Sequence, residues 1–400
     1  MRIKLSDVCV EGGIQTGPFG AQLHQSDYSE WGTPVCMPVN LVDGSISENG
    51  IARVSEEHVE RLSRYKIKLG DLLYARRGDV GRGSLVGVHE DGWLCGTGCL
   101  KVTPDPNKID SRYLFYLTSL PEAIGWLVNH AKGTTMLNLN TGILSSLPLE
   151  IEGNLEKQRR IADILSAYDE LIENNRRQIK LLEEAAQRLY KEWFVDLKFP
   201  GHETTPIVDG LPEGWRMGCL GECCALVKTI SKQDERTGNE LYIGLEHMPK
   251  GSICLRVHGV ATDVIGNKTK FQKGDVLFGK IRPYFHKVGF AQFDGVTSTD
   301  AIVMRAVEGK RAFLLAVASS DEFVSYATAT SKTGTKMPRA DWAAMKSYQI
   351  SIPSADVASR FENICGSFLS AIAQCSSLIA AARETRDRLL PKLMSGEIEV

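Results

Sequence analysis

Residues 154–198, NLEKQRRIADILSAYDELIENNRRQIKLLEEAAQRLYKEWFVDLK, carry the pattern that decides the fold. Apolar side chains recur there in alternating steps of four and three residues, which is the seam of a coiled-coil helix. The seam positions are Ile161, Leu165, Tyr168, Ile172, Asn175, Ile179, Leu182, Ala186, Leu189 and Trp193. The other positions are densely charged, as solvated flanks of a narrow seam are. The stretch predicts one long helix with Asn154 as its N-cap.

The same seam occurs a second time, 200 residues further along the chain. Its positions are Phe361, Cys365, Phe368, Ile372, Cys375, Ile379, Ala382, Arg386, Leu389 and Leu393, and Ser354 takes the place of the N-cap. Two such helices in one chain predict an antiparallel pair, because the long segment between them lets the second helix run back along the first. A buried Asn175 would fix the register of the pair, but a partly exposed position is the favoured interpretation.

The segments around the helices also repeat. Short β-rich runs alternate with turn signals in both halves, and a helix interrupted at Pro121 is predicted over 110–129 in the first half. Three turns of the first half recur in the second at offsets of 207, 204 and 201 residues. They are Gly44-Ser45-Ile46 with Gly251-Ser252-Ile253, Gly70-Asp71 with Gly274-Asp275, and Gly133-Thr134 with Gly334-Thr335.

The sequence therefore predicts an α+β protein with a pseudo-twofold internal repeat. Two mostly β domains are separated by two long helices that pair as an antiparallel coiled coil. The predicted parts are a first domain at 1–153, a central helix at 154–198, a linker at 199–214, a second domain at 215–353 and a C-terminal helix at 354–400. The linker is expected to be polar and rich in turns.

Composition bounds the environment of the protein. A chain of 400 residues with 43% hydrophobic residues can bury more than one core. The net charge of -2 leaves room for local basic faces and does not decide about nucleic acid. No signal peptide and no apolar run of membrane-span length is expected, so a cytoplasmic location is predicted. The ten cysteines lack the usual knuckle spacing and are expected to remain thiols, without a metal site.

Two blocks of the sequence match a known family. The block from Glu156 to Ser166, continuing from Ala186 to Asp196, resembles the central repeat of specificity (S) subunits of type I restriction-modification systems. The ending from Arg386 to Glu397 resembles the C-terminal signature of that family, and Thr16 to Leu23 resembles the opening of many of its target-recognition domains. The resemblance covers essentially the whole chain.

The resemblance implies a function in DNA recognition. Each β domain would read one half of a split double-stranded DNA target, and the helices would set the gap between the halves. The protein would dock two modification (methyltransferase) subunits, which motor-nuclease restriction subunits join. Methyl transfer and cleavage would belong to those partners, and S-adenosylmethionine would be bound by a partner. The chain itself would be no enzyme and would need no cofactor.

The sequence agrees with a non-catalytic chain. It contains no Asn-Pro-Pro-aromatic or Asp-Pro-Pro-aromatic motif for amino methylation, no Walker A loop and no convincing Ser/His/Asp order. Asp79 and Asp275 are interpreted as turn residues. Trp193 and Phe194, near the end of the central helix, are interpreted as core residues more readily than as a contact to a partner.

Basic and polar residues in equivalent loops of the two domains are the candidates for contact with DNA, through phosphates or base edges. In the first domain they are Arg76, Arg77, Arg82, Lys132, Thr134 and Thr135. In the second they are Lys280, Arg282, Tyr284, His286, Lys287, Lys332, Thr333, Thr335, Lys336 and Arg339. Gly17 and Gly20 are expected to shape the backbone.

Two other functions stay open at this point. The chain could be a two-headed coiled-coil scaffold that brings two copies of a partner together without binding DNA. It could also be an enzyme with a site in one β domain, although the absence of catalytic motifs makes this the weakest interpretation.

Overall fold

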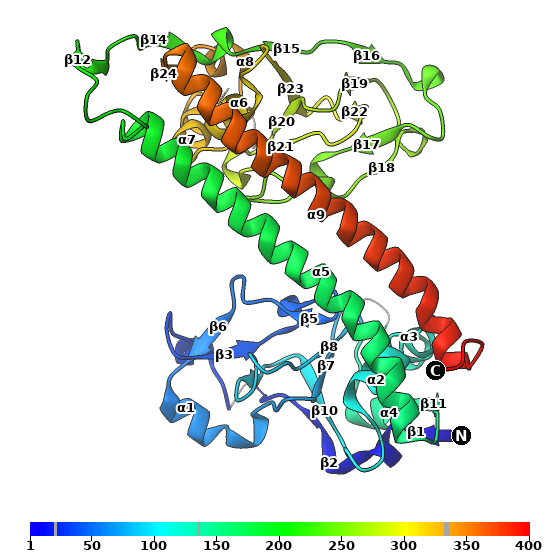
Figure 1. Ribbon diagram of the computed structural model, residues 1–400. Coiled ribbons are helices and arrows are strands. Elements are labelled where there is room, and N and C mark those ends of the chain that lie inside the picture. The colour runs from blue at the N-terminus through cyan, green and yellow to red at the C-terminus, as the bar shows by residue number, and fades with distance from the viewer. Residues whose placement is uncertain (20–21, 134–136, 332–336) are drawn as a thin grey trace. The chain divides into compact units, whose positions relative to one another are not determined.

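The computed structural model describes residues 1–19, 22–133, 137–331 and 337–400, in a mixture of helices and strands (Figure 1). The chain divides into two compact units. Unit 1 comprises Met1–Glu170 with Ala382–Val400, and unit 2 comprises Leu171–Ala381. The two long helices, α5 (Leu155–Tyr190) and α9 (Ala355–Ser395), each contribute residues to both units. Every unit therefore contains the start of one long helix and the end of the other.

Unit 1 is built on an antiparallel four-stranded sheet with the order β2-β10-β7-β8. Its strands are β2 (Cys9–Thr16), β7 (Leu72–Ala75), β8 (Gly83–Leu85) and β10 (Cys99–Pro104). A three-stranded sheet of order β6-β3-β9 lies in the same unit. It is formed by β3 (Thr33–Cys36), β6 (Ala52–Val54) and β9 (Leu94–Cys95). Other elements of unit 1 are β1 (Arg2–Lys4), β4 (Leu41–Val42), β5 (Ser45–Ile46), α1 (Glu56–Arg61) and β11 (Pro148–Glu150).

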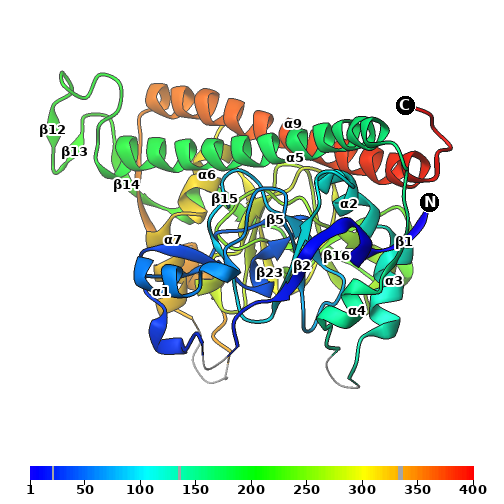
Figure 2. The same ribbon diagram turned by 90° about the horizontal axis from the view of Figure 1, so that it is seen from below.

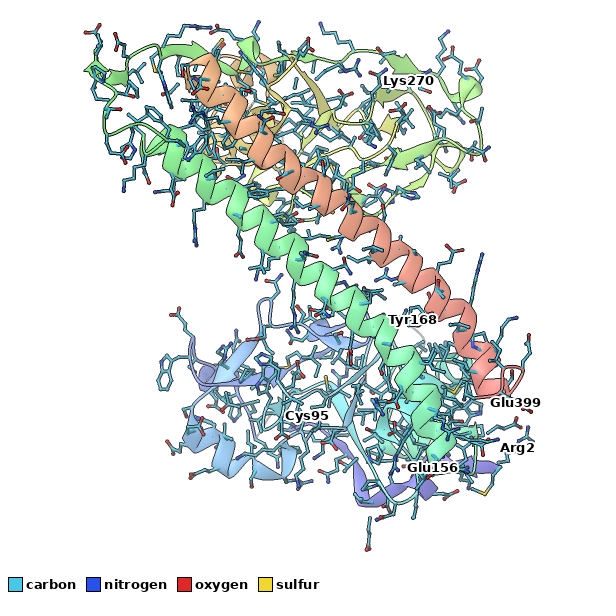
Figure 3. All side chains as sticks on the ribbon, in the orientation of Figure 1. Arg2, Cys95, Glu156, Tyr168, Lys270 and Glu399 are labelled. Atoms are coloured by element: carbon cyan, nitrogen blue, oxygen red, sulfur yellow. The ribbon has the colours of Figure 1, made fainter. Side chains whose placement is uncertain are left out.

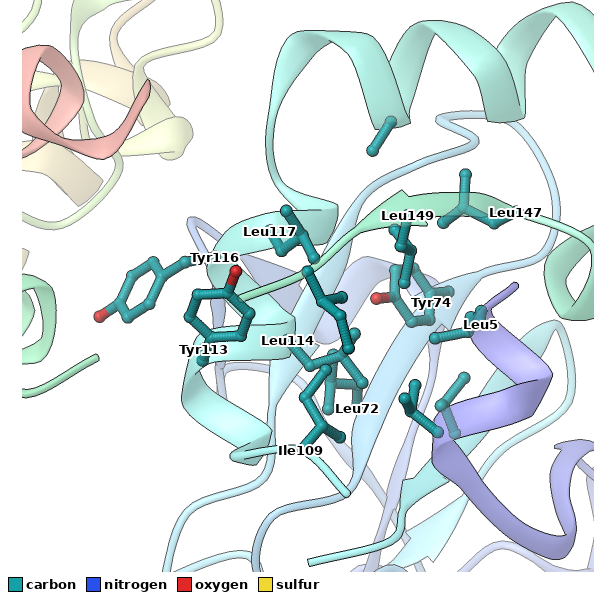
Figure 4. Packing of buried hydrophobic residues seen from close by; sticks show 14 of the residues in the cluster. Leu5, Leu72, Tyr74, Ile109, Tyr113, Leu114, Tyr116, Leu117, Leu147 and Leu149 are labelled. Carbon is teal, nitrogen blue, oxygen red and sulfur yellow. The ribbon is translucent and has the colours of Figure 1, made fainter. Parts of the chain in front are cut away.

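The predicted helix over 110–129 is two helices, α2 (Ser111–Thr118) and α3 (Pro121–His130), and the short α4 (Thr141–Ser145) follows. Asp110 caps α2 by accepting from two backbone N–H groups, and Pro121 begins α3, where its missing N–H is harmless. These helices pack on the sheet through a buried cluster that includes Leu72, Tyr74 and Leu114 (Figure 4). The cluster also takes in residues of α5 and α9.

Unit 2 contains a sheet of corresponding order, β15-β23-β20-β21, and a second sheet of order β16-β19-β22-β17-β18. The first is formed by β15 (Cys224–Leu226), β20 (Val276–Gly279), β21 (Val288–Phe290) and β23 (Ala301–Ala306). The second is formed by β16 (Ile230–Ser231), β17 (Leu241–Ile243), β18 (Gly259–Val260), β19 (Lys268–Phe271) and β22 (Gly295–Thr297). Other elements of unit 2 are β14 (Arg216–Cys219), α6 (Arg311–Ala318), α7 (Asp321–Ala329), α8 (Trp342–Met345) and β24 (Gln349–Ile352).

The heptad pattern correctly identifies the buried faces of α5 and α9. No seam position of either helix is exposed, whereas Glu156, a charged flank residue in the first turn of α5, is exposed (Figure 3). The Asn154 side chain accepts from the N–H of Glu156 at 2.8 Å, which confirms it as a cap. After Tyr190 the helix widens into a π-helical turn, Lys191–Val195, that turns Trp193 and Phe194 into the core of unit 2.

The interpretation of Asn175 as a partly exposed seam residue is wrong, because it is 6% exposed. Its side-chain N–H donates to the carbonyl of Leu171, one turn earlier in the same helix. The side chain is thus satisfied locally, as polar residues in helices often are. Cys375, its counterpart in α9, donates to Gln178 Oε1 at 3.2 Å.

Two other expectations differ from the structure. The segment 199–214 contains a small hairpin, β12 (Ile207–Val208) with β13 (Leu211–Pro212), in addition to turns. The sequence was expected to contain no apolar run of membrane-span length. This expectation is wrong, because α9 is long enough and apolar enough, by length and composition alone, to cross a membrane. The reason is that α9 carries no Asp, Glu, Lys or Arg between Asn363 and Ala382. Its buried seam positions show that one face of this helix packs on protein.

Candidate nucleic-acid interface

Unit 1 brings together the two loops that the sequence singled out. The loop between β7 and β8 lies beside the loop that follows α3, through an isolated bridge between Arg77 and Asn138. Leu139 N–H donates to the carbonyl of Arg76 at 2.8 Å. Lys132 pairs with Asn138 through both backbone groups, at 3.1 and 2.7 Å. Backbone pairing therefore places Arg76, Arg77 and Lys132 on one surface.

The basic side chains of this surface have different environments. Arg77 and Lys132 are exposed. Arg76 donates from Nε to Asn138 Oδ1 at 3.2 Å, and its guanidinium lies 4.9 Å from the ring centre of Phe19. Burial and the neighbouring charge of Arg77 lower the pKa of Arg76. Arg82 forms an ion pair with Asp79 at 3.4 Å, so Asp79 balances part of the positive charge of the loop.

Sequence reasoning missed Phe19 as a site residue. Its ring is 50% exposed although it stacks on Arg76, an arrangement that suits stacking on bases as well as cation–π contact. The signal that could have found it was its position in the segment from Thr16 to Leu23. Gly17 has the expected backbone role, because a Cβ there would collide with the carbonyl oxygen of Gly96. Gly20, Thr134 and Thr135 lie outside the described residues.

Unit 2 pairs the equivalent loops. Ile281 forms an isolated antiparallel bridge with Arg339. Arg282 N–H donates to the carbonyl of Pro338 at 2.9 Å, and Ala340 N–H donates to the carbonyl of Lys280 at 2.8 Å. The structure thus brings the predicted Lys280, Arg282 and Arg339 together. Lys332, Thr333, Thr335 and Lys336 lie outside the described residues.

The loop from Lys280 to Lys287 has an unusual backbone. Arg282 and His286 both have positive φ, 50° and 52°, a conformation that non-glycine residues rarely adopt. Such strain persists where the surroundings hold it, and it clusters at functional sites. His286 is held by Ser319 O, 2.9 Å from its Nε2. Tyr284 between them is 52% exposed, whereas the Lys287 ammonium turns inward to the carbonyl of Leu245.

A cavity of about 540 Å³ lies between the two sheets of unit 2, next to this loop pair. Lys280 and Arg339 line it, together with Lys228 and Trp342, which sequence reasoning missed. Arg339 also forms an ion pair with Asp300, with 3.7 Å between a guanidinium nitrogen and the carboxylate Oδ1. The signal for Lys228 and Trp342 was weak, because they are distant in sequence from the basic loops and only the packing of the two sheets brings them there. Basic side chains beside the ring of Trp342 are suited to bind a nucleic-acid strand, because the cations can contact phosphates and the ring can stack on a base.

The structure offers no competing metal chemistry among the residues that it describes. All ten cysteines are free, and no group of three or more His, Cys, Asp and Glu side chains could hold a metal ion within 1–19, 22–133, 137–331 and 337–400. Burial raises the pKa of the Cys95 thiol to about 12, and that of Cys254 to about 11. These thiols are poor nucleophiles at neutral pH.

Comparison with known proteins shows which proteins the chain resembles. Residues 25–184 match the family described as "Type I restriction modification DNA specificity domain". A specificity subunit of the type I restriction enzyme MjaIX from Methanocaldococcus jannaschii is 24% identical over 374 residues, which cover 88% of this chain and 83% of that protein. The chain is therefore similar to type I specificity subunits over most of its length.

Other relatives agree with this family. The HindI specificity subunit of Haemophilus influenzae is 30% identical over 148 residues, 36% of this chain and 32% of that protein. Among solved structures, the S subunit of a type I restriction-modification system from M. genitalium aligns with a TM-score of 0.62 at 15% identity, covering 98% of this chain and 96% of that one. This likeness extends the shared fold of the specificity subunits to nearly the full chain.

Proposed function

We propose that the two loop pairs are the DNA-contacting surfaces of this specificity subunit, each reading one half of a split target. Residues 1–153 and 215–353 would be the recognition domains. The observation that carries the proposal is the backbone bridge between Arg77 and Asn138 in unit 1 and the bridge between Ile281 and Arg339 in unit 2. The two bridges join equivalent loops, and each carries one cation, in a different loop and with a different neighbour. A common frame with different side chains is what two half-sites of different sequence require.

The long helices are proposed to form the antiparallel coiled coil that sets the gap between the half-sites. In unit 1, Asp169 of α5 pairs with Arg386 of α9. In unit 2, Gln178 pairs with Cys375, and the rings of Trp193 and Phe361 lie 5.9 Å apart. Partner positions rise along α5 as they fall along α9, as antiparallel helices require. The matching strand orders of the two units support an internal repeat.

The remaining functions are proposed from the family. Two methyltransferase subunits would dock on the chain, restriction subunits would join that complex, and the chain itself would not be catalytic. The exposed charged flank of α5 and the exposed residues of α9 between Asn363 and Ala382, where α9 carries no Asp, Glu, Lys or Arg, are surfaces that the helices leave for such partners. S-adenosylmethionine would be bound by the methyltransferase subunits.

The first test is half-site selectivity. The complex with the methyltransferase is expected to select a split sequence from a random DNA library. Arg77→Ala with Lys132→Ala should weaken binding and relax one half-site, whereas Lys280→Ala with Arg339→Ala should relax only the other. Loss of a base contact should cost about 1–3 kcal/mol of discrimination, whereas loss of a phosphate contact should reduce the salt slope by about one.

Arg2→Ala is the matched control for this test, since Arg2 is a highly exposed unit 1 cation paired with Glu150. It should leave both half-sites unchanged. Absence of any preferred sequence would favour the scaffold that does not bind DNA. Equal relaxation of both half-sites by one pair of substitutions would contradict the assignment of one half-site to each unit.

The second test is the spacer. Inserting four residues between Arg177 and Gln178, and four more between Cys375 and Ser376, adds one helical turn to each helix at facing positions. Four residues add about 6 Å, close to two base pairs at about 3.4 Å each. We expect the unread spacer to lengthen by about two base pairs with both half-sites retained. Altered half-sites with an unchanged spacer would exclude the helices as the ruler.

A further inference from the structure

A polar triad joins three elements of unit 1. Asp169 of α5 accepts from the hydroxyl of Tyr116 of α2 at 2.5 Å and forms an ion pair with Arg386 of α9. Tyr116 lies at the edge of the buried cluster and is 5% exposed (Figure 4). The side chains of Arg386 and Asp169 are 22% and 34% exposed. The end of α9 lies beside the start of α5 (Figure 2). The partly desolvated charge pair of Asp169 and Arg386 joins them there.

The equivalent positions of unit 2 are apolar. At the constant offset of 200 residues, Tyr116 corresponds to Ala316, Asp169 to Leu369, and Arg386 to Ala186. All three counterparts are buried, at 5%, 3% and 7% exposed. The residue after Ala186, Gln187, donates to the Ala316 carbonyl at 3.4 Å, which places this part of α5 against α6. Every polar member of the triad thus has an apolar counterpart in unit 2.

A second set of equivalent positions has its charges reversed. In unit 1, Arg383 of α9 pairs with Asp43 of the β4–β5 turn at 2.9 Å. In unit 2, the corresponding helix residue is Glu183, which accepts from Ser252 Oγ at 2.7 Å and from two backbone N–H groups of its turn. The turn residue that corresponds to Asp43 is Lys250. In unit 1 the helix residue is positive and the turn residue is negative. In unit 2 the helix residue is negative and the turn residue is positive.

We propose that these two sets of residues make the two repeats recognise each other and reject copies of themselves. The surface formed by Tyr116 and Asp169 fits the end of α9, with Arg386 and Arg383. It does not fit the end of an α5 from a second copy of the chain, although both helix ends follow the same heptad pattern. The partner selected is therefore the other repeat of the same chain.

Pairing between the same helix of two copies of the chain would leave charged side chains without an opposite charge. If the end of another α5 met the start of α5, Asp169 would face Ala186 in place of a cation, and Glu183 would face Asp43. If the end of another α9 met the start of α9, Arg386 would face Leu369 and Arg383 would face Lys250. A partly buried charge without its partner is strongly unfavourable, and like charges add repulsion. A single buried polar group can specify a coiled-coil pairing in this way.

The experiment uses full-length chains with two different affinity tags, produced together in one cell. We expect wild-type chains to purify without the second tag. The variant Tyr116→Ala/Asp169→Leu/Arg386→Ala gives unit 1 the apolar residues of unit 2, and it should capture the differently tagged copy several-fold more than wild type does. Equal capture by wild type and variant overturns the proposal.

A coupling measurement keeps the proposal testable if the triple variant does not fold. Asp169→Leu and Arg386→Ala should each accelerate amide hydrogen exchange near the end of α9 by roughly tenfold, and the double variant should exchange close to the wild-type rate. The control is Arg112→Ala/Asp163→Ala, which removes a more exposed pair between α2 and α5 and should change exchange little. Additive effects of the two single variants overturn the role of the triad.

Discussion

Replacing Phe194 with alanine is expected to lower the free energy of unfolding of unit 2 by about 3–5 kcal/mol. Phe194 is 6% exposed and sits in the middle of an aromatic cluster. Its ring centre lies 4.8 Å from that of Phe361, 4.9 Å from that of Phe313 and 5.7 Å from that of Trp215. These rings come from the π-helical turn after α5, from α9, from α6 and from the chain before β14, so one truncation leaves a cavity where four segments meet.

Denaturation followed by tryptophan fluorescence measures this effect, because Trp193 and Trp215 flank the ring. Val195 is the matched control, since it is the next residue and is 49% exposed. Val195→Ala should change the free energy of unfolding by no more than about 0.5 kcal/mol. A loss below about 1 kcal/mol for Phe194→Ala would show that the cluster does not hold the helices to unit 2.

Replacing Glu183 with alanine is expected to destabilise unit 2 by about 2–3 kcal/mol, because its Oε1 is the acceptor for Ser252 Oγ and for the N–H of Ile253 and Cys254. Glutamine keeps an oxygen at this position. Glu183→Gln should therefore be tolerated at neutral pH, with a change below about 1 kcal/mol. Similar losses for alanine and glutamine would mean that the charge, and not the acceptor oxygen, matters.

The pH dependence separates these roles further. Burial raises the pKa of Glu183, although hydrogen bonds from Ser252 and its neighbours oppose the shift. A carboxyl group whose folded pKa lies above its unfolded value favours the folded state most at low pH, and loses that contribution as pH rises through the folded pKa. The stability of wild type relative to Glu183→Gln should therefore fall as pH rises above the ordinary glutamate range. Denaturant titrations of both proteins between about pH 4 and 7 measure this difference.

The candidate site was only partly predictable from sequence. Arg76, Lys132, Lys280 and Arg339 were chosen as basic residues in repeated loops, and backbone pairing places the two loops of each unit side by side. The inward turn of Lys287 could not be foreseen, because its partner is a backbone carbonyl about forty residues away. Phe19 was missed for the same reason, since only the fold places it on Arg76.

The sequence by itself determined the secondary structure of the helices and their buried faces, because a heptad pattern is a local property that holds wherever the helix packs. It also predicted an internal repeat from matching residues at offsets of 200 to 207, and the corresponding strand orders of the two units agree with that prediction. Only the tertiary structure decided what each seam position meets. Arg386 is a charged residue at a seam position, and its ion pair with Asp169, which also accepts from Tyr116, makes it a specific contact. Asn175 was interpreted as a partly exposed position, yet it is buried and its amide bonds its own helix. A polar side chain takes its role from the partner that the fold supplies, and that partner is distant in sequence.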